Sequence, residues 1–272
     1  MTITLAICFY RDVDVLLRTL DSIAAQIRRP DEIVIADDGS DEAVGVPIAE
    51  WANKRKVSLI HAWHPKDGFR QSEMRNKAAF VATSEFVSFI DHDCLLPRGF
   101  IRSHLKFANE RHLQLGPRID VMPPTTVNFR PVMLPILRGL AARRLFGWKT
   151  AIRGDKLLPA PPDVIHGCNL LAPKSMINAI NGFDEDFKSW GYEDADFVVR
   201  AWRAGHGIGL SGYGTAVFHL YHPSRADLAN LSRFKASVAQ SRVRCENGIS
   251  KHNGVALQRT VQGFYTRAVF PK

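Results

Sequence analysis

Two aspartates one residue apart, Asp91 and Asp93, follow the hydrophobic run at residues 86–90. The run is β-branched and aromatic, so it predicts a buried strand that ends at these carboxylates. Carboxylates at the tip of such a strand are costly to desolvate unless a positive group meets them. A hard divalent cation and the phosphate that it carries would do so, because Mg²⁺ and Mn²⁺ prefer carboxylate and phosphate oxygen. The D-x-D spacing is a weak signal alone, so the other motifs must support it.

A second acidic pair, Asp37 and Asp38, precedes Gly39 and Ser40 at the end of the strand predicted at residues 32–36. A carboxylate there can accept hydrogen bonds from a base N–H or a ribose hydroxyl, and Gly39 allows a tight turn beside a ligand. Capping of the next helix by Asp38 or Ser40 explains the same residues equally well.

Basic residues gather near the start of the helix predicted at residues 71–83, namely Arg70, Arg75 and Lys77. A helix start has free N–H groups and a positive dipole end, both of which favour anions. The alternative is a solvated basic face. Arg75 and Asn76 precede an apolar run, close to the predicted sheet, which weakens that alternative.

Glu193 and Asp194 follow Trp190, Gly191 and Tyr192. The two aromatic rings offer flat apolar faces of the kind that pack on sugar rings, and a carboxylate beside them could act as a general base on a hydroxyl. Helix capping is the simpler explanation of the adjacent acids. Farther along, His219 and His222 lie at the end of a predicted strand at residues 215–220. An imidazole metal ligand is plausible there because of the acidic triplet.

Strands and helices alternate over the first hundred residues, which predicts a mostly parallel sheet covered by helices. The predicted strands are 3–9, 32–36, 57–62 and 86–91, and the predicted helices are 14–27, 46–54 and 71–83. Ligands bind beyond the carboxyl ends of strands in open sheets of this kind, where both acidic clusters fall. Later elements are a strand at 163–171, helices at 173–180 and 194–204, a strand at 215–220, and a mostly helical basic tail from residue 225.

The central segment at residues 113–162 is rich in proline and contains a basic stretch at 138–156. It predicts irregular structure with a short helix near residues 136–146. A functional lid and a plain surface insertion are equally compatible with it.

The 272 residues are 46% hydrophobic, which is ample for a packed core and excludes a disordered chain. Thirty-six Lys and Arg against 27 Asp and Glu give a net charge of +9, which suits an anionic partner. The four cysteines contain no C-x-x-C pair, which argues against a zinc site or disulfide framework and favours a reducing compartment. The apolar start predicts a core strand, not a signal peptide, and no apolar stretch reaches the ~18 residues of a membrane span. A cytoplasmic protein that rests on the anionic inner leaflet through its basic charge is expected.

Taken in order, the motifs resemble family 2 glycosyltransferases of the GT-A fold. The C-terminal half is galactosyltransferase-like, as in bacterial chondroitin polymerase catalytic domains. The resemblance covers about residues 1–110 and 163–223. It rests on Phe9-Tyr10-Arg11, Asp37-Asp38-Gly39-Ser40, Arg75-Asn76, Asp91-His92-Asp93, Gly167-Cys168-Asn169, Gly182 to Phe187, Trp190 to Asp194, and His219. One departure is the sequence around Phe9, where the family often has proline and asparagine.

The resemblance implies an α/β GT-A domain at residues 1–225, with a nucleotide-sugar half at 1–112, the irregular insertion or lid at 113–162 and an acceptor half at 163–225. A basic helical tail follows at 226–272. It also implies transfer from a UDP-sugar, with inversion, to a glycan hydroxyl in bacterial surface polysaccharide or glycolipid synthesis. The acceptor would be a glycan or a lipid-linked saccharide, and no nucleic acid is expected.

The family's roles transfer to individual residues as follows. Asp38 would hold the base, Asp91 the ribose and Asp93 the metal, with His219 as second ligand and His222 as the fallback. Asp194 would be the general base, supported by Glu193. The expected donor-binding residues are Phe9, Tyr10, Arg11, Asp37, Asp38, Arg70, Arg75, Asn76, Asp91, His92 and Asp93, with His92 itself more of a spacer. The expected acceptor-binding residues are Asn169, Trp190, Gly191 and Tyr192.

Simple chemistry agrees with these roles. Inversion needs one base for the acceptor hydroxyl and a cation to offset charge on the departing diphosphate. Histidine beside aspartate favours Mn²⁺ somewhat over Mg²⁺. Two alternatives stay open: a sugar-nucleotide nucleotidyltransferase, and a non-catalytic module that binds glycans or nucleotides. The first usually needs a glycine-rich phosphate loop after the first strand, where residues 9–12 have no glycine. The second has no use for Glu193 and Asp194 beside Trp190.

Overall fold

The computed structural model describes residues 1–121, 165–222 and 229–271. Within them, a nine-stranded sheet has the order β11-β12-β3-β2-β1-β4-β8-β6-β9. Its strands are β1 (Ile3–Phe9), β2 (Glu32–Asp37), β3 (Leu59–Trp63), β4 (Phe86–Asp91), β6 (His112–Leu115), β8 (Asn169–Pro173), β9 (Gly207–Leu210), β11 (Gln258–Gln262) and β12 (Tyr265–Val269). The pairs among β1, β2, β3, β4 and β12 are parallel, whereas β8 runs antiparallel to both neighbours. The mostly parallel sheet is therefore confirmed.

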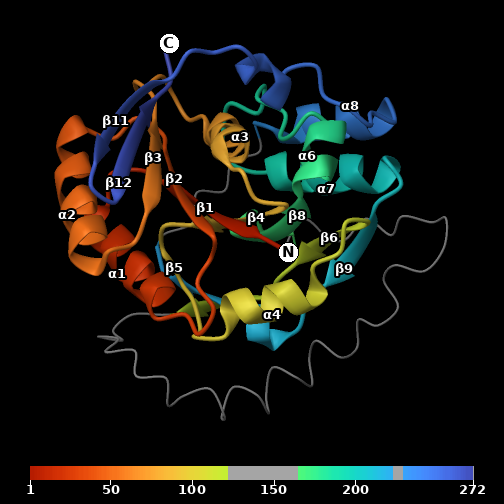
Figure 1. Ribbon diagram of the computed structural model, residues 1–272. Helices are drawn as coiled ribbons and strands as arrows, with labels where there is room; N and C mark the ends of the chain where they lie inside the picture. Colours follow the sequence, from red (N-terminus) through yellow and green to blue (C-terminus); the bar gives the residue numbers. More distant parts are fainter. Residues whose placement is uncertain (122–164, 223–228, 272) are drawn as a thin grey trace.

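Helices cover both faces of this sheet (Figure 1). One face packs on α1 (Val13–Ala24), α2 (Gly45–Arg55) and α4 (Phe100–Phe107), and the other on α3 (Gln71–Val81), α6 (Lys174–Ala179) and α7 (Glu193–Arg203). Strand alternation sorts the side chains: Leu5 and Ile7 of β1 enter the first layer, and Ala6 enters the second. Because both faces are buried, β1 and β4 are mostly apolar, which is why the sequence predicted them well.

A small second sheet has the order β5-β10-β7. It consists of β5 (Cys94–Leu95), β7 (Arg118–Val121) and β10 (Val217–Leu220). In it, His219 pairs with Cys94 across the antiparallel β5–β10 pair. The residue after Asp93 is thus joined to the strand that carries His219, two segments far apart in the sequence.

The predicted helical tail is only partly correct. After residue 228 the chain forms α8 (Leu231–Ala239) and a short 3₁₀ turn, but then the antiparallel hairpin β11–β12. Strand β12 pairs in parallel with β3, so the chain end completes the main sheet, as Figure 1 shows. Alternation in a short polar strand at the edge of a sheet is a weak signal, and β11 is exposed throughout. The expected division between residues 1–225 and 226–272 therefore runs through the sheet.

The irregular structure expected from residue 113 onward is wrong for residues 113–121, most of which belong to strands β6 and β7. Other boundaries moved slightly. The strand expected at residues 163–171 is β8, Asn169–Pro173, and residues 163 and 164 lie outside the described residues. The short helix expected near residues 136–146 and the basic stretch at 138–156 also lie outside them. Among the described residues, no helix combines the length and the apolar character needed to cross a membrane.

Candidate functional site

The sheet register brings the two acidic motifs of the first hundred residues to one edge. Phe9 pairs with Asp37 across β1 and β2, and Cys8 pairs with Asp91 across β1 and β4. The carboxyl ends of these parallel strands thus present Asp38 and Asp91 on either side of β1. This edge is where ligands bind in open parallel sheets.

Asp38 is buried and surrounded by donors. Its Oδ1 lies 3.0 Å from Nε2 of His64, and its Oδ2 accepts from Nζ of Lys66 at 2.7 Å and from the backbone N–H of Arg70 at 3.2 Å. Burial would raise the pKa of Asp38, but the hydrogen bonds from His64 and Lys66 hold that pKa below its usual range. The group is therefore a carboxylate at neutral pH and can accept a further N–H.

Lys66 and Tyr10 close this corner of the site. Nζ of Lys66 lies 4.0 Å from the centre of the Tyr10 ring. The guanidinium of Arg11 lies 4.8 Å from the same centre, and the backbone N–H of Arg11 donates to Oγ of Ser40. Gly39 has φ of +79°, and a Cβ there would lie 2.5 Å from Cα of Lys66. The glycine is needed for this close approach, as the sequence predicted.

Asp37 has a different environment from Asp38. It is fully buried, and its Oδ1 accepts from the backbone N–H and the hydroxyl of Ser40. Its Oδ2 lies 2.9 Å from Nε2 of His61, whose Nδ1 lies 2.8 Å from the hydroxyl of Tyr265. Both oxygens are thus used within the protein. Asp37 orders the Gly39 turn, and His61 links it to Tyr265 of β12.

Asp93, His219 and His222 form a group that could hold a metal ion. One ligand atom from each lies within 4.8 Å of the others. Oδ2 of Asp93 is 3.4 Å from Nε2 of His219 and 3.3 Å from Nε2 of His222. Burial lowers the pKa of His219, which keeps the imidazole neutral and able to bind a cation. The sequence treated the two histidines as alternatives, whereas the structure brings both to Asp93.

The small sheet positions this group. His219 pairs with Asp120 across β10 and β7, and Oδ1 of Asp120 lies 3.1 Å from Nδ1 of His219, on the side away from Asp93. The ring of His92 instead packs edge-on against Phe9 at 5.5 Å, and its carbonyl accepts from Thr19. The ring of His92 therefore packs against β1, and its role as a spacer stays a prediction. Asp120 was missed because a single aspartate in a four-residue strand gives no signal.

Glu193 and Asp194 begin α7, directly after two residues with left-handed backbone. Gly191 has φ of +98° and Tyr192 has φ of +68°. A non-glycine residue in this region costs roughly 1–3 kcal/mol and is typical of functional sites. The ring of Tyr192 stacks on Phe234 of α8 at 5.6 Å, which helps to hold the turn. Trp190 is 45% exposed and is available for contact with a ligand.

Asp194 has an elevated pKa. Burial is the largest cause and the adjacent Glu193 the next, and together they raise the pKa of Asp194 to about 7. Arg75 and two backbone N–H groups oppose the shift: Gly167 donates to Oδ2 and Ala195 to Oδ1, each over 2.8 Å. A carboxylate with a pKa near neutrality is suited to take a proton from a hydroxyl.

Three of the predicted binding residues are engaged inside the protein. Arg75 pairs with Glu193 and Asp91. The amide of Asn76 bonds the backbone of Phe183 and the carboxylate of Glu185. The Asn169 amide donates to the carbonyls of Pro117 and Thr215 and lies 3.2 Å from His104. These side chains hold segments together, which their sequence motifs could not reveal.

Arg70 lies at the start of α3, where its guanidinium donates to the Pro65 carbonyl and lies 3.7 Å from Glu73.

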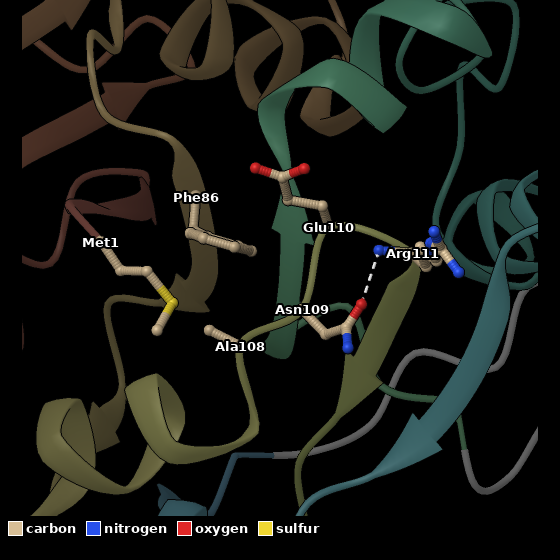
Figure 2. A pocket seen from close by; sticks show the side chains of 6 residues that line it. All are labelled: Met1, Phe86, Ala108, Asn109, Glu110 and Arg111. Atoms are coloured by element: carbon tan, nitrogen blue, oxygen red, sulfur yellow. Dashed lines mark hydrogen bonds between the residues drawn. The ribbon is translucent and has the colours of Figure 1, made fainter.

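A hollow of about 400 Å³ lies away from all these groups, at the amino ends of β1 and β4. Figure 2 shows it beside Met1 and Phe86, the first residues of the β1 and β4 segments, and Arg111. It contains no candidate catalytic group.

The chain matches the family model "Glycosyl transferase family 2" over residues 4–175 and "N-terminal domain of galactosyltransferase" over residues 158–223. It is 26% identical to chondroitin synthase of Pasteurella multocida (strain Pm70) over 198 residues, 65% of this chain and 20% of that protein. It is 24% identical to polypeptide N-acetylgalactosaminyltransferase 6 of Bos taurus over 189 residues, 64% of this chain and 30% of that protein. The chain thus spans less than half the length of these relatives.

Two solved structures are similar in fold. S. aureus TarS in complex with UDP has a TM-score of 0.63 at 15% identity, over 92% of this chain and 68% of that one. The mannosyltransferase PcManGT from Pyrobaculum calidifontis, in complex with GDP-Man and Mn²⁺, has a TM-score of 0.56 at 17% identity, over 88% of this chain and 62% of that one. The likeness confirms the GT-A fold that the sequence predicted.

Proposed function

The chain belongs to glycosyl transferase family 2, and from this premise we propose that it transfers a sugar from a UDP-sugar to a glycan hydroxyl with inversion. One observation carries the proposal. Three groups lie together at the carboxyl edge of the sheet. They are Asp38, the candidate metal ligands around Asp93, and Asp194, whose pKa is raised to about 7. Base recognition, diphosphate neutralisation and proton removal are the three tasks of such a transfer.

The corner at Asp38 favours a keto base. A carboxylate acceptor lies beside the ammonium donor of Lys66, 2.7 Å away. Uracil offers the complement, a ring N–H next to a carbonyl, whereas cytosine and adenine place an acceptor nitrogen next to an amino group. Guanine shares the uracil pattern, so a GDP-sugar is the second candidate. The relatives in fold bind one of each: TarS is in complex with UDP and PcManGT with GDP-Man.

Asp93, His219 and His222 fit a divalent cation, because each offers one ligand atom within 4.8 Å of the other two. We propose that they hold Mn²⁺, or Mg²⁺ in its place, since imidazole ligands suit the former better. When bound, the ion offsets negative charge on the diphosphate. Asp120 faces the other ring nitrogen of His219 and would fix its orientation.

Asp194 is proposed as the base. As the acceptor oxygen forms its bond to the anomeric carbon, the carboxylate takes the hydroxyl proton and the bond to the departing diphosphate breaks. Its two oxygens are oriented by N–H groups from Gly167 and Ala195, so the carboxylate is held for that task. Glu193 would support the acceptor, and Trp190 would stack on a sugar ring. Gly191 and Tyr192 would set the approach to both.

A donor panel tests this function. UDP- and GDP-linked sugars are incubated with the protein, with Mn²⁺ or with EDTA, and the released nucleoside diphosphate is measured in the wild type, Asp93→Ala and Asp194→Asn. Metal-dependent release by the wild type alone supports the proposal. Binding without release in all three proteins would favour a non-catalytic module. Pyrophosphate-dependent formation of a nucleoside triphosphate would indicate the nucleotidyltransferase alternative.

The division of labour along the chain is proposed as well: residues 1–112 for the nucleotide-sugar and residues 163–225 for the acceptor. A role in bacterial surface polysaccharide or glycolipid synthesis, in the cytoplasm at the inner membrane face, rests on the net charge of +9 and the family. Co-sedimentation with anionic vesicles that did not weaken with salt would contradict the electrostatic contact.

A further inference from the structure

Arg75 joins the two acidic motifs of the site. Its Nη1 donates to Oε1 of Glu193 over 3.0 Å, and its Nη2 lies 3.6 Å from Oδ1 of Asp91. Glu193 belongs to α7 and Asp91 to β4, so one guanidinium from α3 spans both halves of the chain. We propose that Arg75 is a positioning residue, which fixes the acidic pair of α7 against the nucleotide half and does not touch the donor. This inference rests on the proposed function.

The burial of Arg75 argues against a donor contact. Its exposed fraction is 2%, and its guanidinium carbon lies 5.3 Å from the centre of the buried Phe183 ring. A Cβ on Gly167 would come within 2.4 Å of Nη2, so the segment before β8 closes over the guanidinium. Arg75 is therefore enclosed by protein on several sides. The sequence had assigned it to donor binding because of its place near the start of α3.

The charges around Arg75 show what it can do. The groups that face it are Asp91 of β4, Glu193 and Asp194 of α7, and the thiol of Cys8 in β1. Burial alone would lower the pKa of Arg75, but these acidic groups raise it, so the guanidinium keeps its charge. One fixed cation thus serves three carboxyl groups. Removing such a buried partner leaves unpaired charges, which is strongly destabilising.

Glu193 is held by only one of its oxygens. Oε1 receives the bond from Arg75, whereas Oε2 is buried and has no hydrogen-bond partner in the described residues. A buried polar atom without a partner needs an explanation, and a ligand hydroxyl would supply one. Because Arg75 holds Oε1, the direction of Oε2 is fixed as well. Asp194 is the next residue in the chain. The guanidinium thereby positions the carboxyl group of Glu193 directly and acts on that of Asp194 through its charge.

Arg75→Lys tests the proposal, because lysine keeps the charge but has no second N–H arm to span both carboxylates. We expect the affinity for UDP, measured by calorimetry, to change by less than about threefold, while release of nucleoside diphosphate falls about a hundredfold through lost positioning. A third measurement follows the carboxyl ¹³C signal of Asp194, assigned with Asp194→Asn. Its midpoint is expected to move upward, because the lysine ammonium is no longer held in place by both carboxylates and offsets the burial of Asp194 less.

Arg200→Lys is the matched control. Arg200 lies in α7 and is fully buried, and its hydrogen bonds go to Asp196 over 2.7 Å and to the Ile180 carbonyl over 2.8 Å, neither of which belongs to the site. The Arg200→Lys substitution should lower the unfolding temperature and leave both the turnover and the titration of Asp194 unchanged.

Three outcomes would overturn the proposal. An affinity for UDP that falls as far as turnover would make Arg75 a donor ligand. Unchanged turnover, or an Asp194 signal that titrates as in the wild type, would deny its positioning role. The NMR titration needs no substrate, so it still decides this point if the wild type releases no nucleotide from any donor and the proposed function fails.

Discussion

Gly167 donates its backbone N–H to Oδ2 of Asp194 over 2.8 Å. The donor comes from the segment before β8, and the acceptor is the second residue of α7. Since a backbone N–H cannot rotate away, this bond holds the carboxylate more firmly than a side-chain donor would. The carboxylate that we propose as the base is therefore held in place by the fold, and several consequences can be measured.

The pH dependence of activity should report Asp194. Its pKa is raised to about 7, and only the carboxylate form can take a proton, so turnover should fall as pH drops through about 7. Asp194→Asn should bind UDP normally and lose about 10²–10⁴-fold in turnover, the usual share of a general base. Rates of donor consumption between pH 5 and 9 test both statements. If Asp194→Asn still lost its residual activity as pH drops through about 7, the fall in activity would belong to another group.

Asp194 should also shape the pH dependence of stability. A carboxyl group whose pKa is higher in the folded state than in the unfolded state binds its proton more tightly when folded. Its ionisation therefore costs stability, progressively between the usual value of 3.8 and about 7. Asp194→Asn removes this cost, so its unfolding temperature should exceed that of the wild type at pH 8 and approach it at pH 4. Scanning calorimetry at both pH values measures the difference in unfolding temperature between variant and wild type. The same difference at pH 4 and pH 8 would contradict the prediction.

Gly167→Ala should disable the site without affecting the corner around Asp38. The added Cβ would lie 2.4 Å from Nη2 of the buried Arg75, far inside van der Waals contact. Arg75 or the Gly167 segment must shift, and a displacement of about 1 Å can cost about a hundredfold in rate. Gly99→Ala is a contrasting variant, because its φ of -97° suits alanine and a Cβ there would meet only Oγ of Ser103, at 3.9 Å. Turnover at saturating donor compares the two, and equal rates would show that the site tolerates the shift.

Four strands of the first hundred residues were predictable because they are largely buried and mostly apolar. Residues of the site that lie at the ends of these strands, such as Asp38 and Asp91, could be found in the same way. The sequence also grouped Glu193 and Asp194 correctly as one acidic pair at the start of a helix. These inferences depend on local pattern, which a single sequence displays.

The structure added what depends on pairing between distant segments. His64 and Lys66 flank Asp38 because β2 and β3 are neighbours, and His222 joins Asp93 because β5 pairs with the strand that carries His219. A signal for Lys66 existed, since it follows β3 at the edge where ligands bind, but spacing alone does not tell a ligand from a solvated lysine. The β11–β12 hairpin was missed because β11 is mostly polar and exposed, and because β12 is short, with only Tyr265 and Ala268 buried.

Both histidines should contribute to metal affinity. His222 is 56% exposed in its side chain, so His222→Ala should fold normally and test the ligand directly. Mn²⁺ affinity, by calorimetry with UDP present, should fall about tenfold to a hundredfold, and further in Asp93→Ala because that variant loses the charged ligand. His112→Ala, at the other end of the sheet, is the control. An unchanged Mn²⁺ affinity in His222→Ala would mean that His219 is the histidine ligand and His222 is not.

Tyr265 should stabilise the protein through a buried chain of hydrogen bonds. Its hydroxyl lies 2.8 Å from Nδ1 of His61, and Nε2 of His61 lies 2.9 Å from Asp37. Tyr265→Phe leaves the buried imidazole without this partner, which should cost about 1–3 kcal/mol of unfolding free energy in urea. Val261→Thr on β11, where the residue is 67% exposed, should stay within about 0.5 kcal/mol. Equal stability of Tyr265→Phe and the wild type would mean that this hydrogen bond adds little to the stability of the fold.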